Sequence, residues 1–76
     1  MSTDTTQILT AIWRQVLAVA AVSPDDDFFD LGGDSFRATQ LAVLVGERLG
    51  VAASPSLAFD RPSLAGQVRW VEAARR

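Results

Sequence analysis

The absence of both cysteine and histidine from a chain of only 76 residues limits how the chain can be held together. Without cysteine no disulfide can form, and without either residue the commonest metal ligands are missing. A single core of fewer than about 80 residues rarely contributes more than roughly 3–5 kcal/mol of net stability. Apolar residues make up 49% of the chain, against five glycines and three prolines, so a small core can form. We therefore predict one domain over residues 1–76, stabilised by packed helices alone.

Apolar residues recur at helical spacing in three segments, and no segment shows the alternation of a strand. The first helix is expected to carry one wide apolar face from Ile8 to Ala20, with Asp4 as its cap and Gln7 as the capping-box partner. The second is expected to begin at Asp34 or Ser35 and to end at Leu49, with Gly50 as a left-handed C-cap. A single turn over 56–60 and a last helix over 64–74, capped by Ser63, follow. The predicted fold is an all-α four-helix bundle with a long loop between helices 1 and 2 and a short third helix.

The second helix is expected to bury one face and to leave apolar residues on the other. Helical geometry places Ala38, Leu41, Ala42, Val45 and Leu49 on the core face. The opposite face carries Phe36, Gln40, Val43 and Glu47. Apolar residues there have two explanations, scattered surface exposure or recognition of a partner. Elsewhere we expect Phe28, Phe29, Leu57 and Phe59 to insert into the core and Trp70 to cover its edge.

Charge is distributed unevenly along the chain, although the net charge is only −2. Residues 1–34 carry six acids against one arginine, and residues 35–76 carry six arginines against three acids. An acidic protein without a clustered basic stripe is a poor binder of nucleic acid, so we exclude that function. The N-terminus has no basic flank before an apolar run, and no apolar stretch is long enough to span a bilayer. These features predict a cytoplasmic protein without a secretory signal or a membrane contact.

The segment DDDFFDLGGDSF, residues 25–36, raises the question of what Ser35 does. A nucleophilic serine needs a base, yet the chain has no histidine and no lysine, and GGDSF is not the G-x-S-x-G elbow. Helix capping by Asp34 or Ser35 explains those two residues but not the glycines and the phenylalanine pair before them. A free-phosphate site lacks the Walker lysine and has an adjacent Asp34. The remaining interpretation is a hydroxyl presented to an outside reagent.

Residues 26–41, DDFFDLGGDSFRATQL, resemble the D-x-F-F-x-L-G-G-[HD]-S-hydrophobic-x-A-x-x-L motif of peptidyl carrier proteins. These are the thiolation domains of non-ribosomal peptide synthetases, within the phosphopantetheine-binding acyl carrier superfamily. The similarity continues through ERLGV at 47–51 and through FDRPSL at 59–64, which matches the family's F-x-x-P-[ST]-hydrophobic step into the last helix. The resemblance covers roughly residues 6–74.

The resemblance implies that Ser35 carries covalent 4′-phosphopantetheine, transferred from coenzyme A by a separate phosphopantetheinyl transferase that binds Mg²⁺ itself. Gly33 and Asp34 would flank the attachment site, and the glycines would leave room for partner enzymes. The thiol of the arm would hold an aminoacyl, aryl or peptidyl group as a thioester. The chain would then have no catalytic residue and no metal site of its own.

The partners that the resemblance implies are the transferase, an adenylation enzyme or domain, and condensation, epimerisation, thioesterase or tailoring enzymes of antibiotic and other secondary-metabolite biosynthesis. Phe36 stands where Leu, Ile or Met is commoner, and Val43 and Leu44 stand where polar residues are frequent. Our hypothesis is that Phe36, Val43 and Leu44 form a partner patch that these enzymes recognise. The alternative is that Phe36 folds back over Leu31 or the arm. We expect a monomer.

Two other functions stay open at this point. One is an acyl carrier protein of polyketide or fatty-acid type, which Gly33 and the phenylalanine pair disfavour. The other is a helical interaction module that is no longer modified. Aspartate before the serine does not settle which enzymes act on the carrier. Met1 and the short tails favour a free-standing protein or one trimmed from a longer chain.

Overall fold

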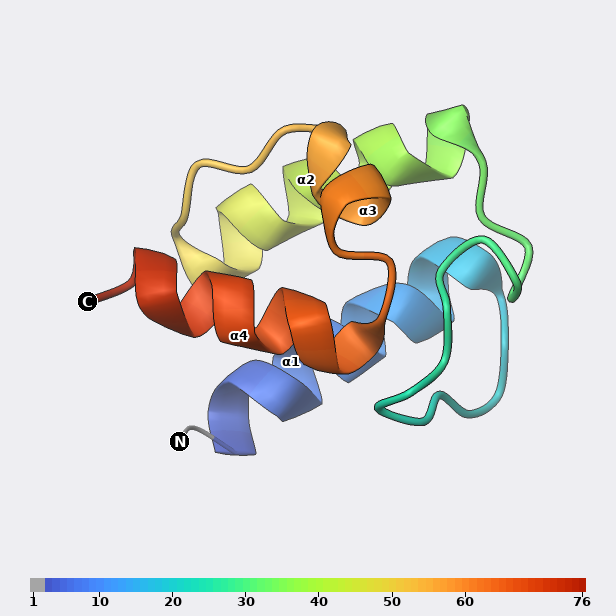
Figure 1. Cartoon of the computed structure of the whole chain (residues 1–76), viewed down its shortest axis with the longest axis horizontal. Helices are drawn as coiled ribbons and strands as arrows, with labels where there is room; N and C mark the ends of the chain where they lie inside the picture. Colours follow the sequence, from blue (N-terminus) through green and yellow to red (C-terminus); the bar gives the residue numbers. More distant parts are fainter. Residues whose placement is uncertain (1–2) are drawn as a thin grey trace.

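Four helices make up the regular secondary structure of residues 3–76, the part of the chain that this computed structural model describes (Figure 1). They are α1 (Thr3–Leu17), α2 (Ser35–Leu49), α3 (Ser56–Asp60) and α4 (Leu64–Ala74). Helix α1 packs against both α2 and α4, and α3 packs against α2. Within the same residues, strand-like pairing is limited to one isolated bridge between Asp27 and Ser63. The predicted all-α fold with four helices is confirmed.

A single core joins the four helices and the loop between α1 and α2. Helix α2 buries the five residues that helical geometry placed on its core face: Ala38, Leu41, Ala42, Val45 and Leu49. Helix α1 contributes Leu9, Ile12, Trp13, Val16 and Leu17.

Among residues 3–76, no helix combines the length and the apolar character that spanning a membrane requires.

The two ends of α1 differ from the prediction. Helix α1 already includes Thr3, so Asp4 lies in the first turn rather than at the cap. In the first turn its carboxylate still interacts favourably with the helix dipole. At the other end Ala18 adopts a φ of 55°, in the left-handed region. The backbone N–H of Val19 then donates to the carbonyl of Arg14 at 3.3 Å, which closes the helix. Ala20, expected on the apolar face, is therefore an exposed loop residue.

The other predicted helix ends are confirmed. Gly50 follows α2 with a φ of 70°, and its N–H donates to the carbonyl of Gly46 at 3.2 Å. The hydroxyl of Ser63 accepts a hydrogen bond from the backbone N–H of Gly66 at 3.0 Å and so caps α4. These caps satisfy amide and carbonyl groups that a helix cannot satisfy internally. They fix where α2 ends and where α4 begins.

One expectation about α3 is wrong. Leu57 is 4% exposed and belongs to the core, but Phe59 is 55% exposed. Two residues that are two positions apart on a helix point about 200° away from each other, so both cannot face the same core. Trp70 on α4 is half-buried at the core edge, as predicted.

Candidate functional site

Ser35 is the first residue of α2, and Asp34 rather than Ser35 caps that helix. The Oδ1 atom of Asp34 accepts from the backbone N–H of Arg37 at 2.8 Å. Ser35 is exposed, and its carbonyl accepts a hydrogen bond from the hydroxyl of Thr39 at 3.1 Å. Within residues 3–76 its own hydroxyl takes part in no hydrogen bond. The Ser35 hydroxyl is therefore not used as a helix cap and is open to an external reagent.

Asp34 is engaged through both carboxylate oxygens. Its Oδ2 atom accepts from Nη1 of Arg37 at 3.0 Å. The two residues form an exposed ion pair and are three positions apart in the chain. The chain offers no histidine or lysine as an alternative base, and an arginine guanidinium stays protonated. The carboxylate next to Ser35 is thus committed to Arg37, and no hydrogen bond within residues 3–76 links the Ser35 hydroxyl to a base, as a self-contained nucleophile would require.

The start of α2 is suited to a negatively charged group on Ser35. The amide of Arg37 is satisfied by the cap, and that of Ala38 donates to the carbonyl of Asp34 at 2.8 Å. The amides of Ser35 and Phe36 lie at the open end of the helix, where no intrahelical acceptor exists. The positive end of the helix dipole lies at the same place. A phosphodiester on the Ser35 oxygen would be stabilised there, so these residues fit a covalently attached 4′-phosphopantetheine.

The two glycines before Asp34 have different structural roles. A Cβ atom on Gly33 would lie 2.6 Å from the carbonyl oxygen of Phe28 and would overlap the Phe28 ring. The N–H of Gly33 donates to the same carbonyl at 3.0 Å. Gly32 has a φ of 104°, which residues other than glycine rarely adopt. A Cβ atom built on Gly32 would have no other atom within 4 Å. Gly32 leaves open space, as the sequence suggested, whereas Gly33 is required by internal packing that the sequence did not reveal.

The loop before Ser35 is fixed to the core by aromatic residues. Phe28 is fully buried, and its ring meets that of Trp13 edge-on, with 5.2 Å between the centroids. Phe29 is half-buried, with its ring 5.5 Å from Phe28 and 4.9 Å from the exposed Phe59. Leu31 packs against the core as well. The predicted role of these residues as anchors of the loop agrees with their positions.

Acidic residues of the loop accept hydrogen bonds from its own backbone. Oδ1 of Asp27 accepts from the N–H groups of Phe29 and Asp30 at 2.8 and 3.2 Å. Oδ2 of Asp26 accepts from the N–H of Ser23 at 2.7 Å. Aspartate is favoured in such turns because its short side chain reaches the backbone two or three residues away. Part of the acidic run is thus explained by turn formation.

The members of the partner patch are not equally exposed. Phe36 and Val43 are 70% and 53% exposed, whereas Leu44 is half-buried and packs against the core. Val43 and Leu44 also line a surface hollow of about 330 Å³ between α1 and α2, together with Gln15, Val16, Thr39 and Gln40. Phe59 is a third large exposed apolar residue, on α3. The sequence signal for its exposure was its spacing from Leu57.

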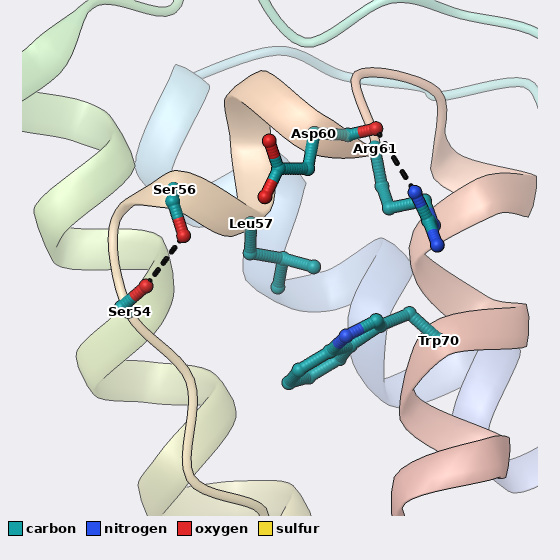
Figure 2. Close-up of a pocket in the computed structure, with 6 residues that line it drawn as sticks. All are labelled: Ser54, Ser56, Leu57, Asp60, Arg61 and Trp70. Carbon is teal, nitrogen blue, oxygen red and sulfur yellow. Dashed lines mark hydrogen bonds between the residues drawn. The ribbon is translucent and has the colours of Figure 1, made fainter.

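A second hollow, of about 240 Å³, lies between α3 and α4 (Figure 2). Its lining includes Trp70, Asp60 and Arg61, and the hydroxyls of Ser54 and Ser56 share one hydrogen bond of 2.6 Å. Nη1 of Arg61 donates to the carbonyl of Asp60 at 3.3 Å. Ser35 does not line this hollow. The candidate site is therefore the start of α2 and not this concave surface.

Residues 7–71 match the family model described as "Phosphopantetheine attachment site". The chain belongs to this family. Its fold and its prosthetic group, 4′-phosphopantetheine, are those of carrier proteins, which are generally non-catalytic domains. The carrier resemblance seen in the sequence is confirmed.

Relatives of the carrier are parts of much longer synthetases. The chain is 36% identical over 67 residues to phosphinothricin tripeptide synthetase PhsC of Streptomyces viridochromogenes, covering 88% of the chain and 6% of PhsC. It is 41% identical over 66 residues to a dimodular nonribosomal peptide synthase of Bacillus subtilis, covering 87% of the chain and 3% of the synthase. The chain thus spans only a small fraction of these relatives.

Solved carrier structures share the fold. The structure of BlmI, a type-II acyl-carrier-protein from Streptomyces verticillus involved in bleomycin biosynthesis, has a TM-score of 0.89 at 27% identity, over 96% of this chain and 88% of that one. A chain in the structure of the phosphopantetheine transferase Sfp with coenzyme A and a peptidyl carrier protein has a TM-score of 0.87 at 25% identity. That match covers 96% of this chain and 95% of the other.

Proposed function

We propose that residues 1–76 form one peptidyl carrier domain in which Ser35 is the attachment residue for 4′-phosphopantetheine. The thiol at the end of the attached arm would bind an aminoacyl, aryl or peptidyl group as a thioester and present it to partner enzymes of non-ribosomal peptide biosynthesis. The observation that carries the proposal is the exposed Ser35 hydroxyl, which makes no hydrogen bond within residues 3–76. It lies at the start of α2 within the part of the chain that matches the family.

In the proposed modification the Ser35 hydroxyl oxygen attacks the phosphorus that links pantetheine to the rest of coenzyme A. A new P–O bond forms to Ser35, the P–O bond to the adenosine bisphosphate half breaks, and that half leaves with the electron pair. The proton of the hydroxyl passes to a base on the transferase, because the adjacent carboxylate of Asp34 accepts two hydrogen bonds from Arg37. The transferase also supplies the Mg²⁺, so activation belongs to the partner and acceptance to this chain.

The residues of this chain contribute position and charge compensation. Asp34 and Gly33 set the direction in which Ser35 leaves the loop, through the cap on Arg37 and the contact with Phe28. Free amides at the start of α2 favour the negative charge that the phosphodiester brings. The ion pair with Arg37 offsets the negative charge that Asp34 places beside the attachment site. Catalytic groups are not required in this chain for any of these roles.

We further propose that the partner patch of Phe36, Val43 and Leu44 is recognised by the transferase and by adenylation, condensation, epimerisation, thioesterase or tailoring enzymes. The exposure of Phe36 and Val43 supports it, because exposed large apolar side chains are common at sites of protein contact. The domain would act as a monomer that meets these enzymes in turn. Its location would be the cytoplasm, where coenzyme A is available to the transferase.

Mass spectrometry of the intact protein tests the attachment directly. The protein is incubated with coenzyme A, Mg²⁺ and the transferase Sfp, and its mass is compared with that of an untreated sample. We expect the mass to increase by one phosphopantetheinyl group. An unchanged mass would reject the carrier function and favour the interaction module that is no longer modified.

Two serine variants locate the modification. S35A removes the only hydroxyl at the start of α2 and should abolish the mass increase, while its circular dichroism spectrum stays that of the parent. S56A removes another exposed serine and should leave the mass increase intact. Modification of S35A would show that the attachment residue has been assigned wrongly. Incubating the modified protein with amino acids and candidate adenylation enzymes would then identify the cargo.

A further inference from the structure

Gln67 is fully buried in the first turn of α4, although glutamine side chains are mostly found at the surface. Both ends of its amide are used. Its Oε1 atom accepts from the indole N–H of Trp13 on α1 at 2.8 Å, and its Nε2 atom donates to the carbonyl of Arg61 at 2.9 Å. A buried side-chain amide is costly unless each group is paired, so this geometry is constrained from both sides.

The carbonyl that Gln67 binds belongs to the link between α3 and α4 (Figure 2). The residue after Arg61 holds the loop, because the carbonyl of Pro62 accepts from the N–H of Phe28 at 2.7 Å. Two further hydrogen bonds connect the loop to the first residues of α4, from Leu64 to Asp26 at 3.3 Å and from Ala65 to Pro24 at 2.9 Å. Fixing the link at residue 61 therefore fixes the backbone to which the loop is attached.

Trp13 gives Gln67 a second connection to the same loop. The Trp13 ring meets the Phe28 ring edge-on, at an interplanar angle of 78°. Phe28 in turn lies directly beneath the backbone of Gly33, two residues before Ser35. The hydrogen bond from Trp13 to Gln67 orients the indole, and the indole supports Phe28. The amide of Gln67 thus reaches the segment before Ser35 from the side of α1 and from the side of the α3–α4 link.

We propose that Gln67 is a positioning residue for the modification of Ser35, and that it holds the loop before α2 in the conformation the transferase binds. The proposal rests on the attachment function proposed for Ser35. An apolar side chain of similar size would fill the same volume, so the hydrogen bonds are the distinguishing property of glutamine at this position. A carrier whose loop is in the competent conformation for only part of the time binds its partner more weakly by that fraction. The chemical step inside the complex is unaffected.

The variant Q67M tests this division between binding and chemistry. It keeps the volume and helix propensity of the side chain and removes both hydrogen bonds. For modification by Sfp with coenzyme A, we expect the KM for the carrier to rise by roughly threefold or more, as the competent fraction falls. We expect kcat to change by less than about twofold, since Gln67 does not touch the reacting atoms. In the unmodified protein, hydrogen exchange should accelerate more at the amides of Phe28 and Gly33 than at Val45 in the centre of α2, whose exchange reports the loss of global stability.

V71A is the matched control for lost stability. Val71 is fully buried one turn further along α4, and its truncation lowers the melting temperature without touching the hydrogen bonds of Gln67. If Q67M and V71A have the same KM and the same exchange at Phe28 and Gly33, Gln67 is only a buried polar residue and the proposal is wrong. W13F removes the indole N–H together with part of the buried ring, so V71A is its control for lost volume as well, and it should shift KM in the same direction. It provides the measurement if Q67M does not fold.

The two proposals fail in different ways. If the parent protein gains no mass with Sfp, the attachment function of Ser35 is rejected, whatever Gln67 does. The hydrogen-exchange comparison of the parent with Q67M uses no transferase, so it still shows whether Gln67 holds the loop. If the parent is modified and Q67M has an unchanged KM together with unchanged loop exchange, the attachment function stands and the positioning role falls.

Discussion

The residues before Ser35 and the residues after it differ in what surrounds them. Before it, Phe28 is fully buried, and the backbone of Gly33 lies against its ring. After it, Phe36 is 70% exposed, and no close pair of aromatic rings among residues 3–76 includes it. The first segment serves the fold, and the second is available to other proteins. A single short motif thus combines a part whose loss should cost stability with a part whose loss should not.

The largest expected effect is that of Phe28→Ala in the buried segment. Truncating a buried phenylalanine typically costs about 3–5 kcal/mol. That is as much as the whole net stability expected for a core of this size, roughly 3–5 kcal/mol. We therefore expect F28A to be mostly unfolded at 25 °C, measured by far-ultraviolet circular dichroism and urea titration.

Phe59→Ala is the matched control for F28A, because it removes the same side chain from a site that is 55% exposed. Substitutions at exposed sites usually change stability by about 0.5 kcal/mol or less, and the ring contact with Phe29 adds to that. F59A should melt cooperatively and only slightly earlier than the parent. An F28A protein that melts like F59A would contradict the distinction between the buried and the exposed segment.

The next effect concerns two glycines that respond oppositely to the same substitution. Gly33→Ala would force a methyl group into the ring and carbonyl of Phe28, and such overpacking costs about 1–3 kcal/mol. Gly46→Ala places its methyl group 3.6 Å from the carbonyl of Val51, an ordinary contact, inside helix α2. There alanine is favoured over glycine by up to about 1 kcal/mol. Urea titration should show G33A less stable and G46A more stable than the parent, and equal stability of the two would remove the packing role of Gly33.

For the exposed segment we predict an effect on modification by the transferase without an effect on folding. Phe36→Glu should leave the melting temperature nearly unchanged and lower kcat/KM for modification by Sfp by about tenfold, the equivalent of one lost apolar contact of about 1.4 kcal/mol. Gln40→Glu adds the same charge to the same face of α2 and should have little effect. If Sfp modifies F36E as fast as the parent, Phe36 is not part of a surface that the transferase recognises.

Most of the fold followed from local patterns in the sequence. The buried face of α2, the left-handed Gly50 and the single turn over 56–60 all depend on spacing or on one residue's conformational preference, and all are found in the structure. The position of Ser35 at the start of a helix also followed from the glycines and the acid before it. These features need no knowledge of contacts between distant segments.

What the sequence did not reveal depends on contacts between distant segments. The need for glycine at 33 comes from the ring of Phe28, and the buried state of Gln67 comes from Trp13, 54 positions earlier in the chain. Exposure of Phe59 is a different case, because its spacing of two residues from Leu57 already places the two side chains on opposite sides of the five-residue helix. The early end of α1 was missed because apolar spacing continues to Ala20 while the backbone turns at Ala18.

The smallest effect tests that turn, which begins the loop leading to Ser35. A left-handed conformation costs an L-residue roughly 1–2 kcal/mol, and glycine avoids that cost. Glycine also makes the unfolded chain more flexible, which offsets about 0.4–1 kcal/mol of the gain. Ala18→Gly should therefore stabilise the protein by about 0.5–1 kcal/mol in urea titration. Ala11→Gly, at an exposed position within α1, makes the same change in a right-handed helix and should destabilise by about 1 kcal/mol. If the two variants shift stability in the same direction, Ala18 is not left-handed in solution, and the boundary between α1 and the loop lies further along the chain.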